Sequence, residues 1–248
     1  MQILKISGGE IDQPDFLDSL AEALAHLDEA TVVVHGGGKE ITKLQDVFGI
    51  KPTYVDGLRI SDEESLALVK MVLCGAVNTR IVEILQRRGI EAQGLSGLDR
   101  GLIRARKLEH PGGDLGRVGE VISVRGDVII DLVEQGIIPV IAPICLGDDG
   151  AFNVNADHVA GAVGAALNAS RVVFLTGIGG VLYDGKIIPV LTADHAETLI
   201  SKGVIVDGMI PKVRTALDVL RRGAQQVLIT SLDGLQTHTG TAIVLKED

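Results

Sequence analysis

Short apolar runs rich in β-branched residues alternate with amphipathic segments along the whole chain, and this alternation most strongly constrains the fold. The runs have the length of buried strands, whereas the segments between them have helical spacing. Continuous apolar strands separated by helices are typical of a mainly parallel sheet covered on both faces, so we predict an α/β fold. We expect strands at 3–6, 31–34, 91–97, 137–144, 171–176, 225–230 and 241–246, and helices at 14–28, 38–48, 61–88, 157–167, 194–202 and 211–222.

Three local patterns refine this outline. Ser61 and Glu64 have the spacing of a capping box, and the long helix they open is predicted to break near Gly75. The stretch 116–129 alternates between turn residues and β-formers, which predicts a hairpin. A division near residue 170 would split a functional site between an N-terminal lobe, 1–170, and a C-terminal lobe, 171–248.

Composition excludes several classes of protein. The net charge is −10, no Trp is present, and only two Tyr and four Phe are, so a nucleic acid would find neither a basic surface nor stacking platforms. Cys74 and Cys145 form no CxxC pair and lie among apolar residues, which indicates buried thiols in a reducing compartment. The start MQILKISGG is too short for a signal peptide, and no apolar run approaches the ~18 residues of a membrane span. We expect a cytoplasmic protein that contacts neither membrane nor nucleic acid.

Clusters of glycine follow the predicted strands, at 8–9, 36–38, 94–97 and 177–180. In parallel sheets ligands bind beyond the carboxyl ends of the strands. Bare backbone that leads into a helix presents unpaired N–H groups, which favour an anion such as phosphate. The stretch VHGGGKE, 34–40, has this form. A tight strand-to-helix turn without a ligand is the alternative.

Familiar motifs fail at these glycines. A P-loop requires Ser or Thr after its Gly-Lys pair, where this chain has Glu40. A dinucleotide fingerprint would need a glycine at Leu182, and a nucleophile elbow would need one at Leu98. His35 has no partner His or Cys at ligand spacing, which favours a structural histidine over a metal ligand.

Two lysines strengthen the phosphate hypothesis. Lys5 lies on an apolar strand, where a charge is costly unless it meets an opposite one, and Lys212 follows the apolar GMIP. Either alone is more often a surface lysine, but both beside glycine clusters suggest a transferring phosphoryl group. Arg59 follows a turn, and the polar stretch 153–157, NVNAD, is either a helix cap or a cluster that holds a small carboxylate.

Ordered motifs resemble those of N-acetyl-L-glutamate kinases, in the amino-acid kinase superfamily. They cover essentially the whole chain: Lys5 with Gly8-Gly9, VHGGG (34–38), DGLR (56–59), GLSGLD (94–99), IPVIAPI (138–144), NVNAD (153–157), GVIVDGMIPK (203–212) and GT (240–241). HGGG is shared across the superfamily, whereas DGLR, NVNAD and GMIPK together are narrower. The resemblance implies a three-layer αβα sandwich of the amino-acid/carbamate kinase type. The N-terminal lobe would hold the acyl amino acid and the C-terminal lobe the nucleotide.

The resemblance also implies a reaction, in which the γ-phosphoryl group of MgATP is transferred to the side-chain carboxylate of N-acetyl-L-glutamate, the second step of arginine biosynthesis. The Mg²⁺ ion would be carried by the nucleotide and not by a metal site of the protein. Lys5 and Lys212 would stabilise charge on the transferring group, and Asp157 would hold the two lysines in place. An ionised carboxylate needs no general base, so positioning and charge neutralisation remain the protein's task.

By the same resemblance, four residues bind substrate. Backbone N–H groups of Gly37 and Gly38 would cradle the γ-phosphate, Arg59 would pair with the α-carboxylate, and Asn153 would hydrogen-bond the α-substituents. The implied nucleotide site comprises Gly8, Gly9, Thr176, Gly177, Gly179, Gly180, Leu182, Val204, Ile205 and Val206.

The chain departs from the family pattern in three places. Gly177 replaces the usual aspartate, which we expect to bear on ATP affinity more than on reaction type. The segment 231–241 is short, so a helix normally found there is expected to be lost. No helix precedes the first strand, where arginine-inhibited hexamers carry one, so we expect a homodimer without arginine feedback.

Other functions stay open. The nearest is the related kinase of carrier-protein-linked aminoadipate or glutamate, although this chain has neither the extra arginines after its DGLR region nor Asp-Gly-Asp at 155–157. Carbamate and uridylate kinases lack DGLR together with NVNAD. A non-catalytic alternative is an amino-acid sensor or a partner of a nitrogen-regulatory protein. Retention of Lys5 and Lys212 disfavours it, because a sensor needs no transition-state charge.

Overall fold

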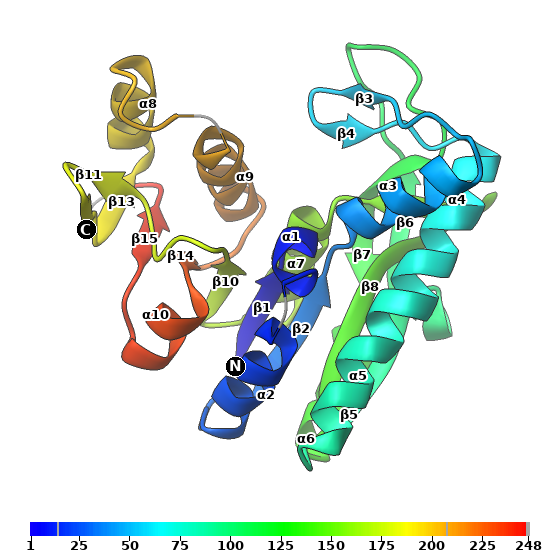
Figure 1. The fold of residues 1–248 in the computed structure, drawn as a ribbon, viewed down its shortest axis with the longest axis horizontal. Helices are drawn as coiled ribbons and strands as arrows, with labels where there is room; N and C mark the ends of the chain where they lie inside the picture. The colour runs from blue at the N-terminus through cyan, green and yellow to red at the C-terminus, as the bar shows by residue number, and fades with distance from the viewer. Residues whose placement is uncertain (14, 207, 247–248) are drawn as a thin grey trace.

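The computed structural model describes residues 1–13, 15–206 and 208–246, which form a three-layer αβα sandwich (Figure 1). The main sheet has 11 strands. They are β1 (Gln2–Ile6), β2 (Thr31–His35), β5 (Ala92–Gly97), β6 (Ile103–Lys107), β7 (Val118–Val124), β8 (Ile138–Gly147), β9 (Gly150–Val154), β10 (Arg171–Leu175), β13 (Val190–Thr192), β14 (Val227–Thr230) and β15 (Thr241–Val244). Two small ribbons are added, β3 (Tyr54–Val55) with β4 (Leu58–Arg59), and β11 (Leu182–Tyr183) with β12 (Lys186–Ile187).

The helices connect these strands. They are α1 (Gly8–Ile11), α2 (Phe16–Ala25), α3 (Gly38–Val47), α4 (Glu63–Lys70), the π-helical turn η1 (Met71–Val77), α5 (Asn78–Arg87), the short 3₁₀ turn η2 (Asp99–Gly101), α6 (Gly126–Glu134), α7 (Ala156–Ala166), α8 (Ala193–Ser201), α9 (Met209–Arg221) and α10 (Leu232–Thr237).

The strand order is β13-β15-β14-β10-β1-β2-β8-β6-β7-β9, and β5 also pairs with β8. The central pairs are parallel: β14 with β10, β10 with β1, β1 with β2, and β2 and β5 with β8. Antiparallel pairs lie toward the two ends of the sheet, between β14 and β15, β6 and β7, and β8 and β9. The predicted mainly parallel sheet is confirmed, and β1 lies at its centre.

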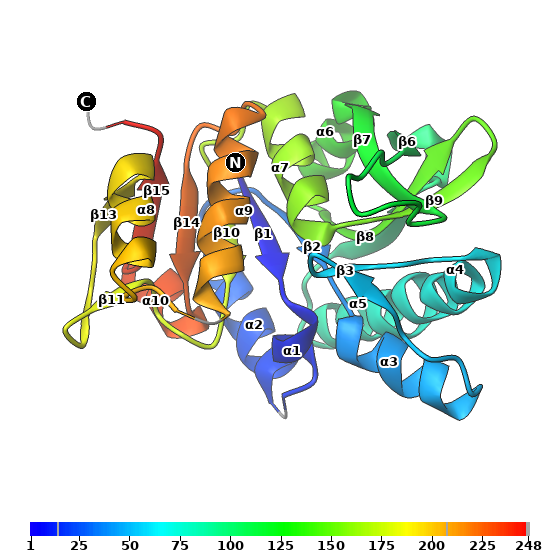
Figure 2. The ribbon, with the colours of Figure 1, turned by 90° about the horizontal axis from the view of Figure 1, so that it is seen from above.

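Two separate cores lie on the two faces of the sheet, because successive side chains of a strand point to opposite faces. On β1, Ile3 belongs to the core that α6–α9 cover, whereas Leu4 and Ile6 belong to the core that α2–α5 cover. Figure 2 shows these two helical layers, with α6 and α7 on one side and α1 and α3 on the other. The residues at the carboxyl end of β1 therefore emerge between two rigid layers.

The stretch 116–129 is not a hairpin. Its first half is β7, whose antiparallel partner is the upstream strand β6, and its second half begins α6 at Gly126. The β-branched residues that suggested a second strand are instead the buried face of this helix, where Val128 and Ile129 enter the core. Tertiary burial has overridden strand propensity at this place.

Four other local predictions have different outcomes. The predicted N-cap is wrong by one residue. The cap is Asp62, whose side chain accepts a hydrogen bond from the Ser65 N–H at 2.7 Å, whereas Ser61 is buried. The break near Gly75 is confirmed as the π-helical turn η1. The helix expected to be lost from 231–241 is present as the six-residue α10, with Ser231 as its N-cap. The helix predicted at 14–28 is shorter, α2, and residue 14 lies outside the described residues.

One helix is long and apolar enough to cross a membrane by length and composition alone, contrary to the expectation from the sequence. It runs from Glu63 to Arg87, through α4, η1 and α5. Half of its most apolar window is buried inside the protein. Val69, Val72 and Ile81 contribute to the core on this face of the sheet. A buried core helix passes the same test, so the feature is a weak sign of a membrane span.

Candidate active site

Two glycine-rich loops meet at the carboxyl ends of the adjacent parallel strands β1 and β2, where Ile6 lies opposite His35. A Cβ atom on Gly8 would lie 2.8 Å from the Gly38 nitrogen and 2.9 Å from the Gly37 Cα. A side chain at residue 8 is therefore incompatible with the contact between the two backbones. Figures 1 and 2 show the outcome, in which the first helical turns after the strands, α1 and α3, lie next to each other.

The glycines of the second loop have different reasons to lack side chains. A Cβ on Gly37 would lie 2.7 Å from Leu73 Cδ2, on the π-helical turn η1. A Cβ on Gly38 would meet no atom of the described residues within 4 Å. Gly37 is thus required by packing, whereas the space beside Gly38 is open to a ligand. Gly37 is the N-cap of α3 and carries no side chain to cap it, so first-turn N–H groups of this ten-residue helix can bind an anion.

His35 anchors the second loop. It is fully buried, its Nδ1–H donates to the Gly36 carbonyl at 3.0 Å, and its Nε2 accepts from the Asn78 amide at 3.1 Å. Burial lowers the pKa of His35 to about 4, so the ring is neutral at pH 7. The structural interpretation of this histidine agrees with its surroundings. The sequence analysis missed its partner Asn78, whose amide also donates to the Val140 carbonyl at 2.9 Å.

Lys5 and Asp157 form an ion pair, with 2.7 Å between Nζ and Oδ1. Lys5 lies next to the end of β1, and its Nζ also donates to Ser7 Oγ at 3.1 Å. Asp157 lies in the first turn of α7, where its N–H donates to Asn155 Oδ1 at 2.8 Å. Both side chains are largely buried, with 12% and 20% of their surface exposed. The strand and the helix thus hold a charged pair in a defined place. The resemblance implied that Asp157 holds both Lys5 and Lys212, and among the described residues its ion pair is with Lys5.

Arg59 is a buried cation with uncharged partners. Its guanidinium donates to the Gly38 carbonyl at 3.0 Å, to Thr42 Oγ1 at 2.8 Å and to Gln45 Oε1. It lies 4.8 Å from the centre of the Tyr54 ring. Burial lowers the pKa of Arg59. A guanidinium that is desolvated without a carboxylate partner favours binding of an anion.

The sequence analysis missed Thr42, Gln45 and Tyr54 as partners of this arginine. Gly38, Thr42 and Gln45 are spaced i, i+4 and i+7, so they share one face of α3, and this spacing could have identified them. The signal for Tyr54 is the pair Asp56-Gly57, which is typical of a two-residue hairpin turn and places Tyr54 opposite Arg59 in the small β3–β4 ribbon.

A cavity of about 280 Å³ lies beside these groups, and we name it the Arg59 cavity. Asn153, which donates to Ser61 Oγ at 3.2 Å, also lines it. The remaining wall is partly apolar, with Ile41, Leu58 and Val118. This cavity brings together the predicted Lys5, Gly37, Gly38, Arg59, Asn153 and Asp157.

A second cavity of about 310 Å³ lies in the C-terminal part of the chain, and we name it the Lys212 cavity. Apart from Lys212 its lining is glycine and apolar side chains, including Ile178 and Met209, which the sequence analysis did not select. It brings together the predicted Gly180, Leu182, Val204, Ile205, Val206 and Lys212. The predicted Gly8, Gly9, Thr176, Gly177 and Gly179 line neither cavity.

These five residues have other surroundings. Thr176 Oγ1 donates to the Ile178 carbonyl at 2.6 Å, which fixes the turn after β10. A Cβ on Gly179 would lie 3.2 Å from Ile187, and one on Gly9 would be in ordinary contact with Lys39. Gly8 supports the Arg59 cavity indirectly, through its contact with the second glycine loop.

Lys212 lies in α9, within electrostatic reach of the pair formed by Lys5 and Asp157. The pKa of Lys212 is lowered, mainly by burial and to a smaller extent by the charge of Lys5. The carboxylates of Glu10 and Asp157 raise it. The two lysines are therefore close enough to repel each other, although each lines a different cavity. Two cations that act on one another in this way would both stabilise an anion that develops further charge.

Neither cysteine belongs to this site. Both thiols are free, and burial raises the pKa of Cys74 and of Cys145. Within residues 1–13, 15–206 and 208–246, no group of three or more His, Cys, Asp or Glu side chains could hold a metal ion.

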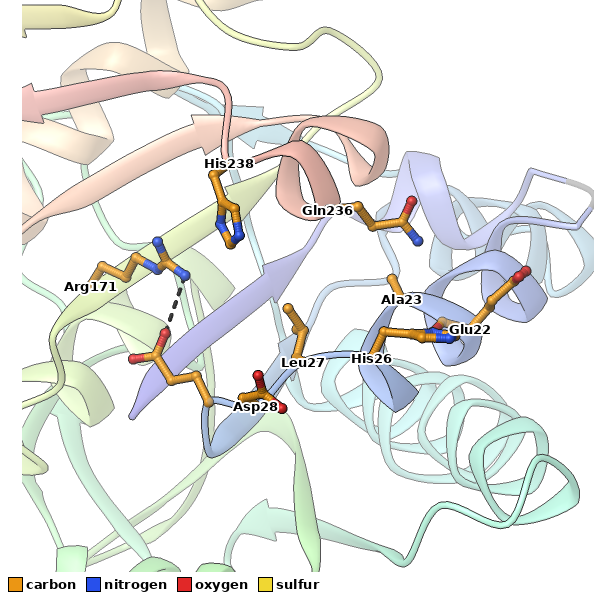
Figure 3. Close-up of a pocket in the computed structure, with 9 residues that line it drawn as sticks. Glu22, Ala23, His26, Leu27, Asp28, Arg171, Gln236 and His238 are labelled. Carbon is orange, nitrogen blue, oxygen red and sulfur yellow. Dashed lines mark hydrogen bonds and ion pairs between the residues drawn. The ribbon is translucent and has the colours of Figure 1, made fainter.

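A larger cavity, of about 440 Å³, has the wrong position for this chemistry (Figure 3). It contains Arg171, at the first residue of β10, whose guanidinium already pairs with Glu29 at 3.2 Å. The cavity thus lies at the amino ends of the parallel strands, whereas ligands of such sheets bind at the carboxyl ends. None of the residues predicted to be functional lines it.

The chain is similar to known proteins over nearly its whole length. The model of the amino acid kinase family matches residues 1–231. A curated protein of Roseiflexus sp. (strain RS-1) named acetylglutamate kinase is 50% identical, over 99% of this chain and 94% of that protein. A protein of the same name from Methanopyrus kandleri is 38% identical, over 98% of this chain and 100% of that protein.

Solved structures give the same fold. A protein of Streptococcus mutans UA159 has a TM-score of 0.82 at 30% identity, and the match covers 99% of this chain and 98% of that one. The N-acetylglutamate synthase of Neisseria gonorrhoeae, complexed with coenzyme A and N-acetyl-glutamate, has a TM-score of 0.84 at 23% identity, over 100% of this chain and 60% of that one, which shows likeness of fold alone. The chain belongs to the amino acid kinase family and, within it, to the acetylglutamate kinases.

Proposed function

We propose that this protein transfers the γ-phosphoryl group of ATP to the side-chain carboxylate of N-acetyl-L-glutamate, and so forms an acyl phosphate in arginine biosynthesis. The activity follows from near-full-length similarity to acetylglutamate kinases. The structural observation that best supports this substrate is the buried guanidinium of Arg59, whose hydrogen-bond partners are all uncharged. A guanidinium in such surroundings favours a carboxylate ligand.

N-acetyl-L-glutamate would occupy the Arg59 cavity. Arg59 has five N–H donors, of which three are used in the described part of the chain, so two remain for the α-carboxylate. Asn153 would hydrogen-bond the α-substituents, since its amide has spare capacity beyond the bond to Ser61. The side-chain carboxylate would then point toward Lys5 and the open space beside Gly38.

ATP would occupy the Lys212 cavity. Leu182, Val204 and Val206 would contact the base and sugar, and first-turn N–H groups at Gly38 would bind the γ-phosphate. The Mg²⁺ ion would be carried by the phosphates, whose oxygens are the ligands that it prefers. The division into an N-terminal lobe, 1–170, for the acyl amino acid and a C-terminal lobe, 171–248, for the nucleotide belongs to this proposal.

The chemistry then needs charge neutralisation and no general base. The attacking carboxylate is already ionised at pH 7, but it is repelled by the triphosphate. Lys5 and Lys212 would reduce this repulsion and stabilise charge on the transferring group and the leaving oxygen. Asp157 would keep Lys5 in position through their 2.7 Å ion pair and would not take up the proton of a nucleophile.

A hydroxamate assay, which traps an acyl phosphate with hydroxylamine, tests the substrate. Protein with MgATP would be offered N-acetyl-L-glutamate, free glutamate and carrier-protein-linked aminoadipate in parallel. We expect product only with N-acetyl-L-glutamate. Product only with the carrier-linked substrate would place the protein among the related kinases that act on carrier proteins. No product with any of the three substrates would favour the alternative function of an amino-acid sensor.

The assembly and the location of the protein stay predictions from the sequence. We propose a cytoplasmic homodimer without arginine feedback, in which the exposed surface contacts neither nucleic acid nor membrane. Sedimentation equilibrium tests the dimer. A titration of arginine in the hydroxamate assay tests feedback, and inhibition at micromolar arginine would contradict this part of the proposal.

A further inference from the structure

Ser7 is the N-cap residue of α1, yet its hydroxyl does not cap that helix. At the N-caps of α4, α8 and α10, the side chains of Asp62, Thr192 and Ser231 each accept a hydrogen bond from a backbone N–H of the first turn. Such a bond is the ordinary reason for a short polar side chain at an N-cap. The hydroxyl of Ser7 is therefore available for another interaction.

This hydroxyl lies between Lys5 and the last residue of β10. It accepts a hydrogen bond from Lys5 Nζ at 3.1 Å and donates a longer one to the Leu175 carbonyl, at 3.4 Å. The two bonds are compatible, because a hydroxyl has one proton to donate and lone pairs to accept with. Ile6 lies opposite Leu175 in the parallel pair of β1 and β10, so Ser7 directly follows the point where both strands end.

The contacts of the Lys5 ammonium come from different elements. Of its three N–H donors, one faces Asp157 Oδ1 at 2.7 Å, from the first turn of α7, and one is bound by Ser7, from the end of β1. The ring of Phe174 on β10 also lies close, with its centre 5.9 Å from Nζ. Within the described part of the chain, two polar contacts thus restrain the ammonium and leave its third N–H for a ligand.

We propose that Ser7 is a positioning residue for Lys5, which holds the ammonium so that its third N–H is directed at the transferring phosphoryl group. The proposal deepens the proposed function and rests on it, because it takes Lys5 as a cation that meets this group. Asp157 compensates the charge of Lys5, and Ser7 sets its direction. Since Ser7 also contacts Leu175 on β10, the position of Lys5 is tied to both of the proposed lobes.

Ser7→Ala tests the proposal, because it removes the hydroxyl and little else. We expect kcat to fall about five- to tenfold, less than the roughly 10²–10³-fold effect of losing a direct transition-state donor. KM for N-acetyl-L-glutamate should change less than about twofold, since Ser7 does not line the Arg59 cavity. Ser19→Ala, at an exposed serine of α2, is the matched control and should leave both constants unchanged. A Ser7→Ala protein with a raised KM and an unchanged kcat would overturn the proposal.

Ser7→Thr is the conservative variant, because it keeps the hydroxyl. The backbone of residue 7 is extended, with φ −74° and ψ 142°, a conformation that suits a β-branched side chain. Its kcat should lie within about twofold of wild type. A Ser7→Thr protein that is as slow as Ser7→Ala and melts at the wild-type temperature would contradict the proposal.

Thermal unfolding separates positioning from a merely structural role. Because the hydroxyl of Ser7 does not cap α1, Ser7→Ala should keep the melting temperature within about 2 °C of wild type. Thr192→Ala removes a hydroxyl that does cap its helix, at 3.3 Å from the His195 nitrogen, and should lower the melting temperature by more. A larger fall in Ser7→Ala than in Thr192→Ala would assign Ser7 a structural role and overturn the proposal.

A readout independent of turnover distinguishes failure of this proposal from failure of the proposed function. NMR relaxation of labelled lysine side chains measures how far the end of Lys5 is restrained, with Lys5→Arg to assign the signal. The order parameter of Lys5 should fall in Ser7→Ala and keep its wild-type value in Ser7→Thr, even if the substrate has been misassigned. An unchanged order parameter in Ser7→Ala would reject Ser7 as the group that positions Lys5. A lower order parameter with an unchanged kcat would instead overturn the role of Lys5 in the proposed function.

Discussion

The Arg59 cavity and the Lys212 cavity differ in how far the protein alone determines the geometry of their polar groups. In the Arg59 cavity, Lys5, Asp157 and Arg59 are each fixed by hydrogen bonds or ion pairs between 2.7 and 3.1 Å. The Lys212 cavity has one charged group and otherwise apolar walls. The first is preorganised for a small, highly charged acceptor, and the second provides an apolar surface for a larger ligand. This difference predicts that changes in the two cavities act on different kinetic constants.

The largest effect is expected from Lys5→Ala. The change removes a cation that would contact the transferring group, and it leaves the largely buried Asp157 without its partner. We expect kcat to fall roughly 10³-fold or more, with a smaller change in KM for N-acetyl-L-glutamate. Hydroxamate formation measures both constants, and Lys43→Ala, an exposed lysine of α3, is the control. A loss confined to KM would show that Lys5 only binds substrate.

Arg59→Gln should act on one substrate. A charge-assisted contact with the α-carboxylate would be lost, so KM for N-acetyl-L-glutamate should rise roughly 10- to 100-fold while KM for ATP stays within about twofold. Arg106→Gln, at an exposed arginine of β6, is the matched control. An equal rise in both KM values would mean that Arg59 supports the fold of the whole site and does not bind the acceptor.

The two glycine loops allow a comparison of stability with activity. Gly8→Ala should lower the melting temperature by several degrees, because its Cβ would lie 2.8 Å from backbone of the other loop. Gly38→Ala should leave the melting temperature nearly unchanged, since its Cβ meets no described atom within 4 Å, but it should reduce kcat roughly tenfold or more by filling the space for a phosphoryl oxygen. Thermal unfolding and hydroxamate assays on both variants test this contrast. Full activity of Gly38→Ala would show that no ligand approaches that backbone.

The smallest effect is expected in the Lys212 cavity. Leu182→Ala removes part of an exposed apolar wall, so KM for ATP should rise about two- to fivefold and KM for N-acetyl-L-glutamate should not change. Ile122→Ala, a similarly exposed apolar residue on β7, is the control. A selective rise in KM for N-acetyl-L-glutamate would reverse the assignment of the two cavities.

Features that depend on local pattern could be predicted from the sequence. The parallel sheet follows from apolar runs separated by helices, whereas the contact of Lys5 with Asp157 was implied by the family resemblance alone. The residues of the Arg59 cavity that were predicted, Lys5, Gly37, Gly38, Arg59, Asn153 and Asp157, were selected mainly through the resemblance to acetylglutamate kinases. The uncharged partners of Arg59, Thr42 and Gln45, could have been found from the helical spacing of α3.

Features that depend on contacts between distant segments could not be predicted from the sequence. Apolar walls resemble ordinary core in the sequence, so Ile178 and Met209 of the Lys212 cavity gave no signal. The contact of Ser7 with Leu175 depends on the register of β1 against β10. The helix α6 was mistaken for a strand because its β-branched residues are selected by burial and not by local propensity.

The central claim is that the two cavities form one active site in which Lys212 stabilises the phosphoryl transfer. The most direct test measures hydroxamate formation and N-acetyl-L-glutamate binding, the latter by calorimetry, on the same preparations of wild type and Lys212→Ala. We predict that Lys212→Ala loses roughly 10²-fold or more of its turnover, while its dissociation constant for N-acetyl-L-glutamate stays within about threefold. Equal loss of binding and turnover would contradict the claim, as would a Lys212→Ala protein that retains wild-type turnover.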